Sequence, residues 1–180
     1  KIIPALRSRC TEFRFPPLPK EHAKKFLDTI VEAEQLSVKD NGMEALIQLG
    51  IGDLRRSINL MEATSMSCNG EITQANVYKC AGYPLPEDME TQLNSLTNNS
   101  LADALASFND IVFNNGLSIL DVIRELHRQV VLRDFPPMVL ANLIDRLSQI
   151  EKRIAEGSPE AVQSAAIVAA FQMLRIELTE

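Results

Sequence analysis

The chain has 180 residues, enough for one large domain or two small ones, and its 46% hydrophobic content suffices for buried cores. The longest continuous apolar run, residues 165–171, is far short of the roughly 20 residues that span a bilayer, so we expect no membrane partner. Residues 1–25 carry a net charge of +5. Because the whole chain carries −6, residues 26–180 carry −11. An acidic body repels the DNA backbone, so phosphate chemistry is expected near the amino-terminal end or at the isolated Arg55-Arg56 pair.

The three cysteines form no C-x-x-C pair, and an odd number argues against a complete disulfide framework, so a reducing compartment fits best. The two histidines, His22 and His127, are far apart and lack the spacing of metal ligands. We therefore expect no metal site.

Residues 1–18 lack helical periodicity. Phe13 and Phe15 alternate around Arg14, which predicts a short strand, and the run Pro16-Pro17-Leu18-Pro19 predicts a stiff, extended connector. The chain opens with Lys1-Ile2-Ile3-Pro4 and no start methionine, which suggests a piece excised from a longer protein.

Residues 19–83 have the pattern of a small helical domain. Apolar residues follow the helical spacing between 23 and 31, and a short helix ends at Gly50-Ile51-Gly52. Asp53 is expected to cap the next helix, and Thr73 a last short one.

The run Gly82-Tyr83-Pro84-Leu85-Pro86 predicts a second stiff connector, and we place a domain boundary between residues 83 and 84. Five helical segments follow, joined by short connections that favour an antiparallel bundle. The expected helices cover residues 87–97, 100–114, 118–133, 136–156 and 159–178. The predicted fold is therefore all-α.

Three of these helices have recognisable starts. Ser100 and Ser118 are expected caps, and the spacing from Ser118 to Asp121 has the form of a capping box. Pro159 is expected at the first helical position, where its missing N–H has no cost.

The fifth helix is apolar nearly all round from Val162 to Leu174. Such a helix either lies at the centre of its own bundle, which we favour, or meets another subunit. For an interface, Phe171 is the expected buried anchor and Gln172 the expected rim residue. This apolar excess predicts that residues 84–180 mediate subunit association.

Two short motifs place arginines beside helix-start residues: Ser8-Arg9-Cys10, and Gly52 to Asn59, which reads Gly-Asp-Leu-Arg-Arg-Ser-Ile-Asn. Arginine offers a permanent charge in a donor fork that suits phosphate oxygens. Taken alone, Arg9 would be a solvated side chain in a basic loop, with Cys10 buried beside it. The sequence contains no glycine-rich phosphate loop.

The context of these motifs is specific. Residues 2–15 read Ile-Ile-Pro-Ala-Leu-Arg-Ser-Arg-Cys-Thr-Glu-Phe-Arg-Phe. This run resembles the end of the ATPase domain in the small subunits of replication factor C, the eukaryotic sliding-clamp loader of the AAA+ ATPase family. Residues 52–59 resemble the sensor-2 segment of its helical lid, and Cys80 to Pro84 the boundary to its five-helix collar. The resemblance covers essentially the whole chain.

The resemblance implies three parts. Residues 1–18 are the residual end of the ATPase domain with its connector, residues 19–83 are the lid, and residues 84–180 are the collar, an oligomerisation domain.

The resemblance also implies roles for two side chains. Arg9 would be an arginine finger that reaches the ATP site of a neighbouring subunit, and Arg55 would be the sensor-2 arginine that contacts nucleotide bound to its own subunit. The phosphate loop and the acidic pair for magnesium would lie before Lys1. The fragment is thus not expected to be an enzyme or to hold a cofactor, whereas the whole protein would bind ATP and magnesium.

The implied function is DNA replication and repair. The collar would hold the subunit in a heteropentameric ring with other replication factor C subunits, and the ring would load the sliding clamp onto primer–template DNA in the nucleus. Two alternatives are a freestanding all-helical adaptor and the equivalent fragment of an archaeal or bacterial clamp loader. A freestanding enzyme is disfavoured because no nucleophile–base pair or carboxylate cluster has catalytic spacing.

Overall fold

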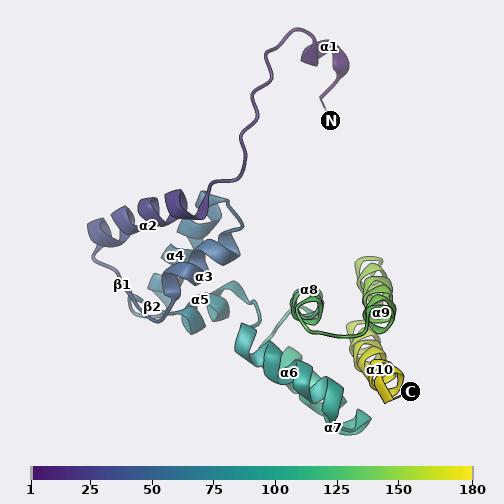
Figure 1. Ribbon diagram of the computed structural model, residues 1–180. Helices are drawn as coiled ribbons and strands as arrows, with labels where there is room; N and C mark the ends of the chain where they lie inside the picture. The colour runs from purple at the N-terminus through teal and green to yellow at the C-terminus, as the bar shows by residue number, and fades with distance from the viewer. Residues whose placement is uncertain (1, 180) are drawn as a thin grey trace. The chain divides into compact units, whose positions relative to one another are not determined.

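The structure, a computed structural model, describes residues 2–179, and these residues contain ten helices and two strands of two residues each (Figure 1). The predicted all-α class is confirmed. The chain divides into two compact units, Lys1–Val77 and Tyr78–Glu180. This division falls inside a helix, before the boundary that we placed between residues 83 and 84. The assignment of residual ATPase, lid and collar domains remains a prediction.

The first unit begins with an extended segment. After the one-turn helix α1 (Pro4–Arg7), residues 11–19 have no regular structure, so the predicted strand at Phe13–Phe15 is wrong. Phe13 is 75% exposed and Phe15 is 91% exposed. A strand needs a neighbouring strand to take up its backbone hydrogen bonds, and no described residue pairs with this segment.

The rest of the first unit contains four helices and the two strands. In chain order they are α2 (Lys20–Glu34), β1 (Ser37–Val38), α3 (Gly42–Gly50), α4 (Leu54–Ser67), β2 (Glu71–Ile72) and α5 (Gln74–Ala81). The core consists of fully or nearly fully buried apolar side chains, among them Leu27, Leu46, Met61, Ile72 and Val77. Thr73 caps α5 as predicted, because its side-chain oxygen accepts a hydrogen bond from the Asn76 backbone N–H at 3.3 Å.

The two strands pair in parallel, Ser37 with Glu71 and Val38 with Ile72, which the sequence did not predict. Two residues are too few to give an alternating pattern. The Lys39 ammonium group lies 2.9 Å from the Glu71 carboxylate, across the end of this pairing. The hydrogen bond to Glu71 raises the pKa of Lys39 above its ordinary value.

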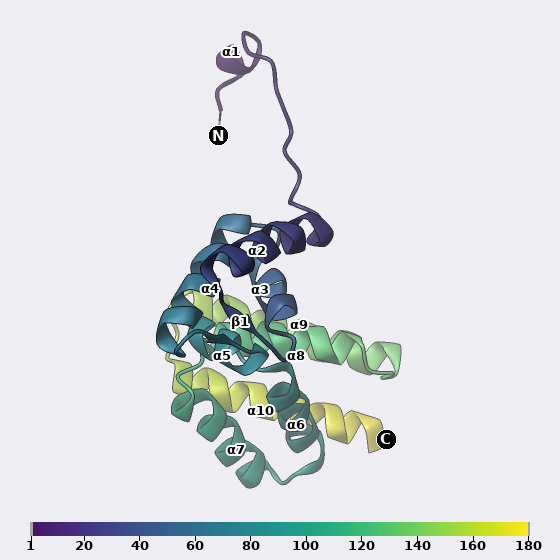
Figure 2. The same ribbon diagram turned by 90° about the vertical axis from the view of Figure 1, so that its left-hand side faces the viewer.

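The second unit contains all five predicted helices, with ends within two residues of those expected. They are α6 (Pro86–Asn98), α7 (Leu101–Asn114), α8 (Ile119–Val131), α9 (Pro137–Ala155) and α10 (Glu160–Thr179). Helix α10 contacts α6, α7 and α9, and α8 contacts α6 and α9, so the five helices enclose one apolar core (Figure 2). Its largest fully buried side chains include Phe108, Met89, Ile123 and Phe171.

The helix starts agree only in part with prediction. Ser100 caps α7 through its hydroxyl group. The oxygen accepts a hydrogen bond from the Asp103 N–H at 3.3 Å, and the O–H donates to the Asp103 carboxylate at 2.6 Å. The capping box at Ser118 is wrong: the Ser118 side chain makes no capping bond, and its backbone carbonyl accepts from the Asp121 N–H instead. Pro159 lies one position before the first helical residue of α10, where its carbonyl accepts the first helical hydrogen bonds.

Helix α10 is buried along one side and exposed along the other. Ile167, Val168, Phe171 and Leu174 are completely buried, whereas Val162 and Met173 are 60% and 46% exposed. Among the described helices, α10 is the one long and apolar enough to cross a membrane, judged by length and composition alone. The core helix of a soluble domain passes the same test, and the buried side of α10 has that role here.

The predicted role of Phe171 as an interface anchor is wrong. The Phe171 ring is 0% exposed, within the core of its own unit. The side-chain amide of Gln172 donates to the carbonyls of Leu96 and Asn99, both at 3.2 Å, and so covers the end of α6. The Phe171 ring is therefore not available to another subunit, whereas Gln172 is half-buried and its role at a rim remains a prediction.

Candidate functional site

Arg9 follows a short helix whose end is held by local hydrogen bonds. The Ser8 hydroxyl donates to the Ala5 carbonyl at 3.2 Å, and the Arg9 N–H donates to the Leu6 carbonyl at 3.1 Å. Arg9 is exposed, and no carboxylate among the described residues pairs with its guanidinium. The Arg9 side chain is therefore available to an anion from outside this chain.

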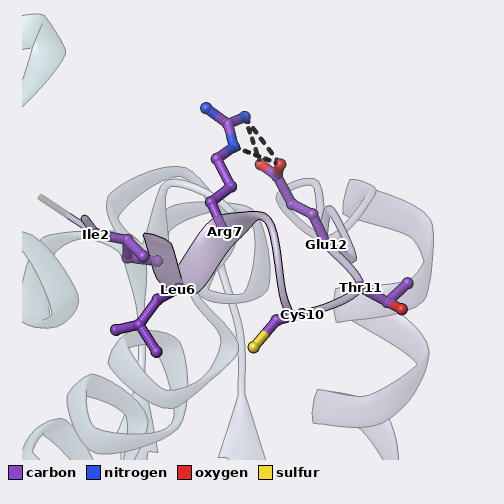
Figure 3. A pocket seen from close by; sticks show the side chains of 6 residues that line it. All are labelled: Ile2, Leu6, Arg7, Cys10, Thr11 and Glu12. Atoms are coloured by element: carbon purple, nitrogen blue, oxygen red, sulfur yellow. Dashed lines mark hydrogen bonds and ion pairs between the residues drawn. The ribbon is translucent and has the colours of Figure 1, made fainter. Parts of the chain in front are cut away.

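The neighbouring Arg7 is engaged, in contrast to Arg9. Its guanidinium points toward the Glu12 carboxylate, and the closest N–O distance is 2.8 Å (Figure 3). Ile2, Leu6, Cys10 and Thr11 complete a shallow, open pocket beside this pair. Cys10 is exposed, so the expectation that it is buried is wrong. No larger apolar element of the described chain covers it.

Asp53 sets the position of Arg55. As predicted, Asp53 caps α4: its carboxylate accepts hydrogen bonds from the backbone N–H groups of Arg55 at 3.0 Å and Arg56 at 3.3 Å. Both arginine side chains are exposed. The amino terminus of a helix carries a partial positive charge, which adds to that of the two guanidinium groups. The Asp53 carboxylate is the anion bound at this end of α4, and the two exposed guanidinium groups lie beside it as further donors.

The turn before α4 needs its glycine. Gly52 has a φ of +76°, in the left-handed region, and a Cβ added to it would lie 2.7 Å from the Cβ of Pro17. The Gly52 carbonyl accepts a hydrogen bond from the Leu18 N–H at 3.3 Å, which ties the proline connector to this turn. Residues of the connector, α2, α3 and this turn line a pocket beside the start of α4. Any larger residue at position 52 would displace the connector.

The structure does not join Arg9 and Arg55 in one site. The hydrogen bonds and ion pairs of the described residues 2–15 are all local. The connection between the two motifs begins only at Leu18, through the bond to Gly52. Within the described chain, no group of three or more His, Cys, Asp or Glu side chains is arranged to hold a metal.

One polar cluster was missed by the sequence analysis. Glu125 on α8 is 4% exposed and is the one charged side chain that is buried among the described residues. Its carboxylate accepts hydrogen bonds from the guanidinium of Arg128, at 3.0 and 3.2 Å from Nε. The sequence did contain a signal for this buried pair. Glu125 lies three residues after Val122 on the apolar side of α8, and Arg128 follows three residues later.

Comparison with known proteins identifies the family. Residues 84–170 match the family described as "Replication factor C C-terminal domain". A protein of Dictyostelium discoideum named probable replication factor C subunit 5 is 40% identical over 176 residues, which cover 97% of this chain and 51% of that protein. The chain belongs to the replication factor C family.

Further relatives agree with this assignment. The replication factor C subunit 5 of Homo sapiens is 38% identical over 175 residues, covering 97% of this chain and 51% of that protein. The replication factor C small subunit of Halobacterium salinarum is 35% identical over 173 residues, covering 96% and 53%. The chain thus spans about half the length of the curated relatives it matches. The relatives from Dictyostelium discoideum and Homo sapiens are both named subunit 5.

Proposed function

We propose that this chain is the lid and collar portion of a clamp-loader small subunit, and that its second unit joins the subunit to its neighbours in a heteropentameric ring. The support from the sequence is the similarity to replication factor C subunits over nearly the whole chain. The support from the structure is an exposed apolar surface on α10.

An apolar stripe runs along the outer side of α10. It consists of Val162, Ala165, Ala169 and Met173, and all four are exposed. Their spacing of three, four and four residues places them on one face of the helix. The central positions are alanines, which allow another helix to approach closely, and the outer two supply larger apolar side chains. The stripe lacks charge, as the centre of an interface between subunits usually does.

The occupant of the stripe in this proposal is a helix from the collar of another replication factor C subunit. In the whole protein, Arg9 would act on the ATP site of the neighbouring subunit, and Arg55 on the nucleotide of its own subunit. Both are exposed, and neither pairs with a carboxylate among residues 2–179, which is consistent with both roles. The whole protein would bind ATP and magnesium, and the ring would load the sliding clamp onto primer–template DNA in the nucleus.

The isolated chain is proposed to be neither an enzyme nor a nucleotide-binding protein, because its sequence has no phosphate loop. Purified chain should show no ATP turnover and negligible ATP affinity. Measurable turnover that is lost in Arg55→Ala would contradict this part of the proposal.

Charge placed on the stripe tests the collar assignment. Ala169→Glu should abolish binding of this chain to the other replication factor C small subunits in a pull-down, because the carboxylate would be buried without a partner. The control is Ala106→Glu, the same change at an exposed alanine on α7. Both variants should keep the helix content of the unmodified chain. Equal binding by both variants would exclude the stripe as the contact surface, and a chain that binds no subunit would favour a freestanding adaptor.

A further inference from the structure

The buried carboxylate of Glu125 makes more hydrogen bonds than the packing of α8 alone requires. Besides Arg128, its carboxylate accepts a hydrogen bond from the side-chain amide of Gln129 at 3.3 Å. The same amide donates to the backbone carbonyl of Pro86 at 3.0 Å. A continuous chain of hydrogen bonds therefore runs from Arg128 through Glu125 and Gln129 to the first residue of α6.

The segment before Pro86 is folded into a compact turn. Gly82 has a φ of +62°, its N–H donates to the Lys79 carbonyl at 3.2 Å, and the Tyr83 N–H donates to the Tyr78 carbonyl at 3.0 Å. These two bonds form a Schellman motif, in which the residues at the two ends of the outer bond usually make an apolar contact. Here those residues are Tyr78 and Tyr83, whose ring centroids are 6.2 Å apart.

The tyrosine pair belongs to the same environment as Glu125. Burial, and next the negative charge of Glu125, raise the pKa of both tyrosines above the ordinary value. Tyr78 is 1% exposed. The residues from Tyr78 onward are part of the second compact unit, although the sequence placed the boundary after Tyr83.

We propose that Glu125, with Arg128 and Gln129, is an anchor that holds residues 78–86 against α8, so that this connector is a rigid part of the C-terminal unit. The connector joins the part of the chain that carries Arg55 to the part that carries the α10 stripe. The anchor fixes where the chain enters the C-terminal unit, at residues 78–86 rather than after the prolines. The inference does not depend on the proposed function.

An ordinary structural role for Glu125 makes a different prediction. If the ion pair only fills space in the bundle, its loss should loosen all five helices alike. If it is an anchor, the effect should concentrate in residues 78–86 and the first turn of α6. Amide hydrogen exchange separates the two because it reports local opening segment by segment.

The experiment is hydrogen exchange with mass spectrometry on the full chain, comparing Glu125→Gln, Gln129→Ala and the unmodified protein. The Glu151→Gln control removes one of the two carboxylate partners of Arg124, an exposed residue of α8, which lies 3.3 Å from Glu151 and 3.5 Å from Asp121. A hydrogen bond to a charged group corresponds to roughly ten- to a hundredfold in local opening, so Glu125→Gln should speed exchange in peptides covering residues 78–86 on the order of tenfold or more. Gln129→Ala should give a smaller increase in the same peptides.

Two outcomes would overturn the anchor. One is unchanged exchange in residues 78–86 in both variants. The other is an equal increase across α6 to α10. Because Gln129→Ala leaves the Glu125–Arg128 pair intact, it keeps the test decisive even if Glu125→Gln does not fold. Glu151→Gln should change neither the connector nor the core.

Discussion

Residues 2–19 bury none of their side chains, whereas α6 to α10 enclose 19 buried apolar residues in one core. Both regions contain large apolar side chains. Phe15 is 91% exposed and Phe171 is 0% exposed, although both lie in strongly apolar stretches. The difference is that the five helices supply one another with apolar partners, whereas residues 2–15 find none in the described chain outside their own segment. The C-terminal unit is thus able to hold its own structure, while the amino-terminal segment presents groups for contacts outside this chain.

The largest effect expected from the amino-terminal segment is on catalysis in the assembled whole protein. Arg9→Ala should lower ATP hydrolysis at the neighbouring subunit's site and leave nucleotide binding by its own subunit unchanged. A trans-acting arginine contributes about 10³–10⁵ in rate in GTPases, and an assembly with several sites should lose less overall. Steady-state ATPase and nucleotide-binding assays check this, with Arg14→Ala, an exposed arginine of the same segment, as the control. Unchanged hydrolysis in Arg9→Ala would reduce Arg9 to a surface residue.

The next largest effect is on stability, and it compares the two regions directly. Phe171→Ala should destabilise the C-terminal unit by about 3–5 kcal/mol, because it leaves a cavity in a closed core. Phe15→Ala should change the free energy of unfolding by less than about 0.5 kcal/mol, since the ring contacts little in this chain. Urea denaturation measures both. Similar losses for the two variants would show that the amino-terminal segment packs more than the structure indicates.

A smaller effect is expected at the cap of α4. Asp53→Ala removes the acceptor of two backbone hydrogen bonds and should cost roughly 1 kcal/mol, whereas Asp53→Asn retains an acceptor and should cost less. Thermal unfolding followed by circular dichroism compares the two. If Asn were as damaging as Ala, the capping account of this position would fail.

The smallest effect concerns an ion pair on the C-terminal unit. Hydrogen bonds from Arg146 and then from Asn142 lower the pKa of Glu177 below its ordinary value of 4.5. A lowered pKa in the folded state stabilises the fold above about pH 4.5, and this contribution disappears as the pH falls through the folded-state pKa. Glu177→Gln should therefore lower the unfolding temperature slightly at neutral pH, and the difference should vanish on acidification. A difference that persists or grows at low pH would contradict the assignment.

The sequence predicted the helices better than the contacts between them. Apolar spacing and cap residues located α6 to α10 to within two residues, because these signals are local. The pairing of Ser37 with Glu71 and the hydrogen bond from Gln129 to Pro86 join residues distant in the chain, which no local pattern specifies. The same limit explains Phe171. The apolar width of α10 was evident, but which side faces the core depends on how α6, α7 and α9 pack around it.

For the candidate site, the motifs identified Arg9 and Arg55 but not their surroundings. The cap at Asp53 followed from a known preference of helix starts, and the structure confirms it. The exposure of Cys10 and the pairing of Arg7 with Glu12 could not be anticipated, since both depend on how residues 2–15 turn. The functional roles of the two arginines remain predictions that come from resemblance to the family.

The most direct test of the difference between the N-terminal and C-terminal parts of the chain is to ask which of them binds another subunit. Native mass spectrometry of a fragment covering residues 78–180, mixed with each of the other replication factor C small subunits, should detect a one-to-one complex with at least one of them. A fragment covering residues 1–83 should form none. A C-terminal fragment that is folded but stays monomeric, together with an N-terminal fragment that binds, would contradict the account.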